Sequence, residues 1–133
     1  MELYRESGPD EPMTMHRSDS YRNLIAWQKA MALVKSVYTI TASWPADERF
    51  GLTSQVRRAA VSVPANIAEC SGRSGVREFR RGLSVAHGSL RELETQIQLG
   101  ADLGFSTTIE IGPVIEQAAE VERLRAPSQP RRR

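Results

Sequence analysis

The stretch EFRRGLSVAHGSLRELETQIQLG, residues 78–100, decides the fold class because it carries the most regular apolar pattern in the chain. Apolar or small residues recur there at alternating spacings of four and three, at Phe79, Leu83, Ala86, Leu90, Leu93, Ile97 and Gly100. A helix places such a row on one face, whereas a strand would need alternation at every second residue. The pattern therefore predicts a long amphipathic helix over residues 74–103 that packs against other helices.

The segment before it predicts a second helix over residues 47–70. Its inner row comprises Leu52, Val56, Ala59, Val63, Ile67 and Cys70. Asp47 and Glu48 would place negative charge in its first turn, where the helix dipole favours it. Pro64 removes one backbone hydrogen bond and predicts a bend in the axis. Gly72 lies in the break that follows and can adopt the left-handed conformation that ends a helix.

A third amphipathic segment, residues 20–44, predicts the first helix, which ends before Pro45. We expect its contact seam to be the row Leu24, Trp27, Met31, Val34, Tyr38 and Thr41. A second row, Leu33, Val37, Ile40 and Trp44, widens the apolar surface. Small residues at Ala30, Ala59, Ala60, Ala65 and Ala68 permit neighbouring helices to approach closely. Two apolar rows on one helix suggest self-association.

A fourth helix is predicted over residues 107–125, opened by Thr107 or Thr108. Its inward residues are Ile111, Val114, Ala118 and Val121. Four helices joined by short loops predict an all-α fold, an antiparallel up-down-up-down four-helix bundle over residues 20–126. Residues 1–19 form a predicted disordered leader, and residues 127–133 form a predicted disordered basic tail.

Length and composition bound the class of protein. A chain of 133 residues suits one domain with a real core. No apolar run approaches the roughly 18 residues that a membrane span needs, so no membrane partner is expected. Cys70 is the one cysteine and cannot form an internal disulfide, which indicates a reducing compartment and hence the cytoplasm.

The sequence displays no catalytic apparatus. Its histidines are His16 and His87, and neither follows a glutamate by three positions, as a di-metal bundle site would require. Zinc, nucleotide-loop and nucleophile-elbow motifs are absent as well. We therefore expect no catalytic residues, no metal and no cofactor, and predict that the protein is not an enzyme.

Charge is segregated along the chain. Residues 49–91 carry eight arginines against two glutamates, a net of +6, whereas residues 92–125 carry seven acids against two arginines, a net of −5. The candidate nucleic-acid-binding residues are Arg57, Arg58, Arg73, Arg77, Arg80 and Arg81. Arginines near a helix N-terminus suit phosphate. The alternative left open is that the acidic segment neutralises them, within the bundle or across a subunit interface.

Three stretches carry a resemblance to a known family: LIAWQKAMALVKSVY, FGLTSQVRRAAVSVPANIAECSGR and EFRRGLSVAHGSLRELETQIQLGADLGF. The resemblance covers residues 21–104. The most specific is RRAAVSVPANIAE followed by SGR. The chain resembles the four-helix-bundle family that includes proteins encoded in intervening sequences of bacterial large-subunit (23S) ribosomal RNA genes. The accessory variability determinant of diversity-generating retroelements belongs to the same family.

The resemblance implies a homopentameric bundle of basic character suited to RNA or DNA. In the retroelement branch it also implies a reverse transcriptase partner. The motif positions carried over are Arg57, Arg58, Asn66, Glu69, Gly72, Arg73, Gly88, Ser89 and Glu92. No catalytic role is implied for them. Cys70 stands where the family usually has glycine, and the C-terminus departs from the family's longer apolar helix. Two functions remain open, a nucleic-acid-binding oligomer and a structural adaptor whose arginines make inter-subunit ion pairs and which binds only a protein.

Overall fold

The computed structural model describes Tyr21 and residues 24–71 and 75–124. The predicted leader (1–19), the predicted tail (127–133) and the proposed cap at Gly72 lie outside these residues.

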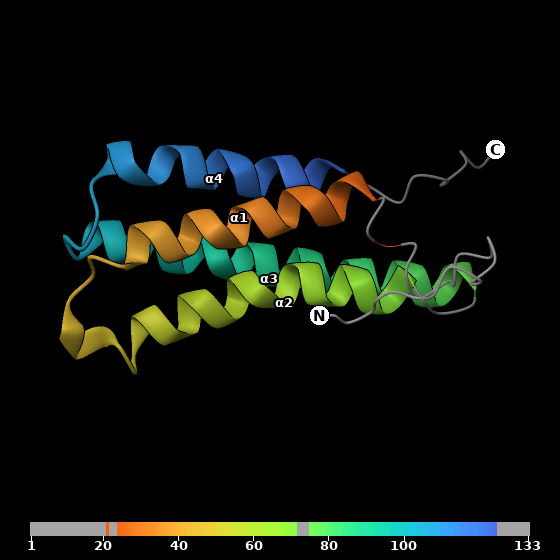
Figure 1. Cartoon of the computed structure of the whole chain (residues 1–133), viewed down its shortest axis with the longest axis horizontal. Coiled ribbons are helices and arrows are strands. Elements are labelled where there is room, and N and C mark those ends of the chain that lie inside the picture. Colours follow the sequence, from red (N-terminus) through yellow and green to blue (C-terminus); the bar gives the residue numbers. More distant parts are fainter. Residues whose placement is uncertain (1–20, 22–23, 72–74, 125–133) are drawn as a thin grey trace, which may run out of the picture.

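Four α-helices make up most of the described chain. They are α1 (Ile25–Thr41), α2 (Leu52–Ser71), α3 (Val76–Asp102) and α4 (Thr108–Arg123), with a short 3-10 helix, η2 (Ala46–Glu48), between the first two. Successive helices run in opposite directions (Figure 1). In the described part of the chain, each helix packs against two neighbours, α1 on α2 and α4, and α3 on α2 and α4. The predicted antiparallel up-down-up-down four-helix bundle is confirmed.

The second helix begins later than the sequence predicted. Residues 46–48 form the separate η2 turn, in which the Glu48 and Arg49 amides donate to the Pro45 and Ala46 carbonyls. Gly51, a poor helix former, separates this turn from α2. Glu48 still interacts with the helix N-terminus, because its carboxylate accepts a hydrogen bond of 2.9 Å from the Leu52 amide. The acidic residues therefore precede the helix that they were expected to begin.

The fourth helix begins where predicted, at a reciprocal cap. The Glu110 amide donates to Thr107 Oγ1 at 3.0 Å, and the Thr107 amide donates to Glu110 Oε1 at 2.9 Å. These bonds satisfy two amides that the helix itself leaves unpaired. Among the described residues, α4 also buries all four predicted inward positions, Ile111, Val114, Ala118 and Val121.

The core is built from one face of each helix. The α3 row is buried from Ala86 through Leu90, Leu93 and Ile97. The α2 row is buried at Val56, Ala59, Val63, Ile67 and Cys70, as predicted. Pro64 is buried inside α2, which continues past it to Ser71.

The first helix turns a different face to the core from the one predicted. Its buried residues are Ala30, Leu33, Val37 and Thr41, followed by Trp44 just beyond the helix. The expected seam is wrong at Met31 and Tyr38, which are exposed. Its other members are buried, as at Thr41, or half-buried against the core, as at Leu24, Trp27 and Val34. The row expected only to widen the apolar surface is the one at the centre of the buried face, and the Trp27 row lies along the edge of the core.

Two close contacts join the helices at opposite ends of the bundle. At the end formed by residues 42–51 and 103–107, the indole of Trp44 donates to Ser106 Oγ at 2.7 Å. A Cβ atom at Gly100 would lie 2.5 Å from the same indole. At the other end, Gly82 of α3 lies directly against the side chain of Cys70 of α2. Glycine is needed at both places because any side chain would collide.

Candidate nucleic-acid interface

Three of the predicted arginines surround the first turns of α3. Arg77, Arg80 and Arg81 are all exposed. Arg80 and Arg81 follow Arg77 by three and four positions, so both neighbour it on the helix surface. Within the described chain, Arg77 and Arg81 have no ion-pair or hydrogen-bond partner. Arg73, another of the six candidate arginines, lies outside the described residues.

Arg80 and Arg81 flank Arg77 on opposite sides. Arg80 lies three turns before Arg91 on the flank of α3 that faces α4, and Arg91 there pairs with Glu122. Arg81 lies on the α2 side, where it lines a cleft. The cluster therefore spans the outer width of α3 at this end of the bundle.

The cleft beside Arg81 lies between the end of α2 and the beginning of α3. Its volume is about 240 Å³, and it is lined by Asn66, Glu69, Cys70, Glu78, Arg81, Gly82 and Val85. The Asn66 amide donates to the Ser62 carbonyl at 2.7 Å, which fixes its orientation. The lining includes no histidine, and two carboxylates accompany one guanidinium. The negative side chains of the cleft offset part of the charge of Arg81.

The structure separates the two arginines of α2 from each other. The Arg57 guanidinium lies 4.4 Å from the Tyr38 ring centroid, and its Nε donates to Thr41 Oγ1 at 2.9 Å. Thr41 in turn donates to the Val37 carbonyl at 2.8 Å. Arg57 therefore joins α2 to α1, whereas Arg58 is exposed and has no partner in the described part of the molecule.

Arg58 faces outward, well away from the α3 cluster. Two contacts align the helices, a hydrogen bond from Gln96 to Gln55 and the packing of Gly82 on Cys70. They place Arg58 level with the middle of α3, roughly 18 Å along the axis from Arg81. The sequence grouped Arg57, Arg58 and the α3 arginines together, but the structure brings only the α3 arginines side by side.

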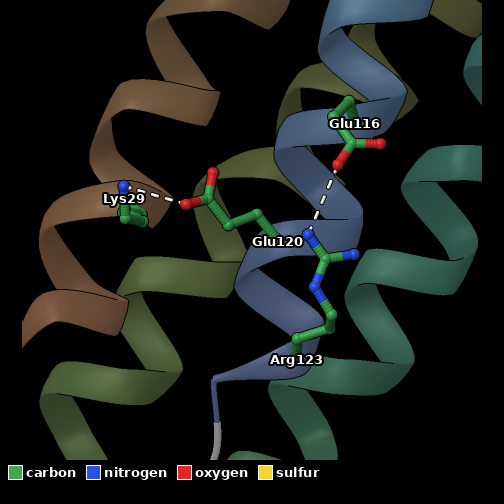
Figure 2. Close-up of polar contacts among 4 residues, drawn as sticks. All are labelled: Lys29, Glu116, Glu120 and Arg123. Carbon is green, nitrogen blue, oxygen red and sulfur yellow. Dashed lines mark hydrogen bonds and ion pairs between the residues drawn. The ribbon is translucent and has the colours of Figure 1, made fainter.

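The acidic residues of α4 interact elsewhere. Glu120 pairs with Lys29 of α1 at 3.0 Å, and Glu116 pairs with Arg123 at 3.3 Å within α4 (Figure 2). Glu122 pairs with Arg91 at 3.2 Å, and Glu110 is held in the α4 cap. Over the described residues, no α4 carboxylate neutralises Arg77 or Arg81. The acidic residues of α4 in the same chain therefore do not balance the charge of these two arginines.

One carboxyl group at the α3–α4 boundary has a shifted pKa. Burial raises the pKa of Glu94 above its ordinary value, the nearby Glu122 carboxylate raises it further, and the Arg91 guanidinium lowers it. Arg91 thus offsets part of the repulsion between two glutamates. Nothing in the local sequence signals this pair, because its members are 28 positions apart.

Neither a metal cluster nor a membrane span occurs in the part of the chain that the structure describes. In residues 24–71 and 75–124 no group of three His, Cys, Asp or Glu side chains is placed to hold a metal ion. No helix in those ranges is long and apolar enough to cross a membrane.

Antiparallel helices around one core, with a cluster of exposed arginines at one end, define a helical-bundle protein. Residues 22–126 match the family model described as 23S rRNA-intervening sequence protein, and the chain belongs to this family. The resemblance carried by the motif RRAAVSVPANIAE is thereby confirmed at the level of the family. No match was found among curated proteins.

Proposed function

We propose that this protein is a non-catalytic homo-oligomeric bundle that binds nucleic acid through its exposed arginines. Arg77 and Arg81 would contact phosphate directly, and Arg73 and Arg80 would add further contacts. Arg58 would make a separate contact from α2. The observation that carries the proposal is that Arg58, Arg77 and Arg81 have no carboxylate partner within the described chain, while the α4 glutamates are already engaged.

We leave Arg57 out of this set. Its guanidinium stacks on Tyr38 and its Nε is bonded to Thr41, so phosphate binding would compete with a contact between α1 and α2. We assign Arg57 to the structure of the bundle and the other five arginines to nucleic acid.

The oligomer is supported by apolar side chains that the single bundle leaves exposed, such as Met31, Tyr38 and Leu99. A pentamer, and a reverse transcriptase as partner, are proposed from the family resemblance, and the cytoplasm is proposed from the single cysteine. A neighbouring reverse transcriptase gene with a variable repeat would support that partner, and its absence would favour an origin in an rRNA insertion.

Phosphate binding is tested by measuring RNA and DNA affinity across a salt series. The variant Arg77→Ala/Arg81→Ala should bind at least tenfold more weakly, and the slope of log K against log salt should fall by about one for each phosphate no longer bound. The matched control, Arg91→Ala/Arg123→Ala, removes the same charge from arginines that are already ion-paired. Equal affinity of the first variant and the wild type, or an equal loss in the control, would contradict the proposal.

The alternative function is a structural adaptor whose arginines pair with acids of a neighbouring subunit. Sedimentation of the Arg77→Ala/Arg81→Ala variant separates the two functions. Loss of the oligomer with no change in nucleic-acid affinity would favour the adaptor, whereas an intact oligomer with weakened affinity would favour phosphate binding.

A further inference from the structure

The cleft between the end of α2 and the beginning of α3 opens beside the arginine cluster. Arg81 belongs to both, because it lines the cleft and neighbours Arg77 on the surface of α3. The cleft volume, about 240 Å³, lies below the roughly 300–1,000 Å³ of pockets that enclose a drug-sized ligand. A strand whose phosphates are held by Arg77 and Arg81 would therefore carry its bases past an opening that suits one small flat group.

Asn66 and Glu78 lie toward opposite ends of this cleft. The packing of Gly82 on Cys70 places these two residues at the same level of the bundle. Glu78 is one turn before Gly82 on α3, and Asn66 is one turn before Cys70 on α2, which runs in the opposite direction (Figure 1). The backbones of Asn66 and Glu78 are therefore roughly 12 Å apart along the bundle axis, which leaves room for one planar ring system between the two side chains.

Each end of the cleft has a group that is free to bind a ligand. Glu78 and Arg81 are three positions apart on α3 and both line the cleft, yet over the described residues neither makes an ion pair or a hydrogen bond, with the other or with a third group. Asn66 donates one amide hydrogen to the Ser62 carbonyl at 2.7 Å and keeps its second amide hydrogen for a ligand. The Glu78 end therefore accepts hydrogen bonds, and the Asn66 end can donate one.

The other lining residues favour a flat ligand that carries donors on one edge. Gly82 and Val85, which is 50% exposed, form an apolar wall against which the face of a ring can pack. Glu69 already has an interaction of its own, but it adds a second negative charge to the lining. The cleft therefore attracts donor groups of a base and repels phosphate, which stays with the arginines outside it.

Guanine is the base whose edges match these two ends. Its N1–H and N2–H are adjacent donors that one carboxylate can accept together, and its O6 and N7 are adjacent acceptors on the opposite side of the ring system. Adenine and cytosine each place their amino group beside a ring nitrogen that accepts, which a carboxylate would repel. Uracil offers a single N3–H between two carbonyl oxygens. Such edges are read in single strands, whose bases can leave the stack.

We propose that the cleft holds one unstacked guanine of a single-stranded nucleic acid. Glu78 accepts from the N1–H and N2–H of the base, Asn66 donates to O6 or N7 at the opposite edge, and Arg81 holds the adjoining phosphate. This inference rests on the nucleic-acid binding of the proposed function and adds a base preference to it. The arginines supply affinity for any strand, whereas the cleft selects the base.

The test compares the affinities of the full chain for two RNA decamers, oligouridine and the same strand with one central guanosine, by fluorescence anisotropy at fixed salt. The wild type should bind the guanosine strand about tenfold more tightly, and inosine, which lacks the 2-amino group, should lose most of that gain. Glu78→Gln should reduce the preference to less than about twofold, because an amide accepts at one atom only. It should also strengthen oligouridine binding slightly, because a negative charge near the arginines is removed. The matched control, Glu116→Gln, makes the same charge change at an exposed glutamate outside the cleft and should keep the full preference.

Circular dichroism establishes that both variants keep their helices, and the methyl resonances of Val85 report where the base binds. These resonances should shift with the guanosine strand and not with oligouridine. Equal affinity of the wild type for both strands, a preference that survives in Glu78→Gln, or unshifted Val85 resonances would overturn the inference and leave salt-dependent phosphate binding standing. Failure of the wild type to bind either strand at low salt would instead overturn the nucleic-acid half of the proposed function, and this inference with it.

Discussion

Cys70 of α2 occupies, with its Cβ and Sγ atoms, the space that a side chain at Gly82 of α3 would need. The Cys70 side chain is buried, and it lines the same cleft as Arg81. The distance between α2 and α3 at this end of the bundle is therefore set by one small residue on each helix. The position of the arginine cluster relative to Asn66 and Glu69 depends on the same contact.

Replacing Gly82 by alanine should destabilise the bundle even though alanine is the better helix former. Separation of α2 and α3 to admit a methyl group should lower the free energy of unfolding by about 1–3 kcal/mol. Gly88→Ala is the matched control, since a Cβ at Gly88 meets nothing within 4 Å, and it should raise stability by about 0.5–1 kcal/mol. Urea unfolding measures both.

The same contact predicts a rescue. Cys70→Gly removes the atoms that collide, so Gly82→Ala should cost less in that background than in the wild type. If the two substitutions changed the free energy of unfolding additively, the contact would not be the cause of the lost stability.

Removing the hydroxyl of Ser106 should destabilise the opposite end of the bundle. Ser106→Ala leaves the buried indole N–H of Trp44 without its acceptor at 2.7 Å, which should cost about 1–3 kcal/mol. Ser43→Ala removes an exposed hydroxyl at the same end, whose bond to the Ile40 carbonyl is 3.5 Å, and should change stability by less than about 0.5 kcal/mol. Similar losses in both variants would contradict the assignment.

Glu94 should make the stability of the bundle depend on pH. The pKa of its carboxyl is raised in the folded state, mainly by burial and then by Glu122, so the folded protein binds the proton more tightly than the unfolded chain. Stability from this group therefore rises as pH falls through that pKa and is lost as pH rises. Glu94→Gln should be more stable than the wild type at pH 7, and the difference should shrink in acid. Thermal unfolding from pH 7 to pH 4 measures it, and a constant difference would contradict the prediction.

Arg57 and Arg58 should behave oppositely although they are adjacent. Arg57→Ala removes the Tyr38 stacking and the Thr41 hydrogen bond and should lower stability by about 1–2 kcal/mol. Arg58→Ala should change stability by less than about 0.5 kcal/mol but weaken nucleic-acid binding. Unfolding and binding measured on both variants test this, and the reverse pattern would contradict the assignment of Arg57 to structure.

Much of the fold followed from the sequence because three helices each have one apolar row. On α3, Ala86, Leu90, Leu93 and Ile97 leave a single face that can be buried. On α4, the cap at Thr107 could be read from its spacing to Glu110. A helix with one apolar face and recognisable ends has few ways to pack, so pattern alone was sufficient there.

The first helix shows where pattern is insufficient. Its two rows, one through Met31 and Tyr38 and the other through Leu33 and Val37, are both apolar, and spacing does not say which faces the core. Which row is buried depends on the side chains that α2 and α4 place beside α1. Arg57 reaches the Tyr38 flank, and Glu120 pairs with Lys29 on the other, so the row between these flanks is buried.

The sequence predicted which residue type forms the candidate site but not how those residues are arranged. Six arginines stand out in the sequence, but their partners come from other helices and no local spacing reveals them. The sequence did not predict the cleft either. Its lining residues come from two helices, and Glu78, Gly82 and Val85 join Asn66 and Glu69 only after α2 and α3 pack. Gly82 was the one available signal, as a glycine inside an otherwise strong helical pattern.

The α2–α3 contact is the most extensive in the bundle, whereas α4 meets its two neighbours over less surface. Proteins open locally at elements with few buried contacts, and these openings occur without global unfolding. Backbone amides of α4 should therefore exchange with deuterium before those in the middle of α2 and α3. Since α4 holds Lys29 and Arg91 through Glu120 and Glu122, each such opening would break two ion pairs and leave both cations unpaired on the other helices.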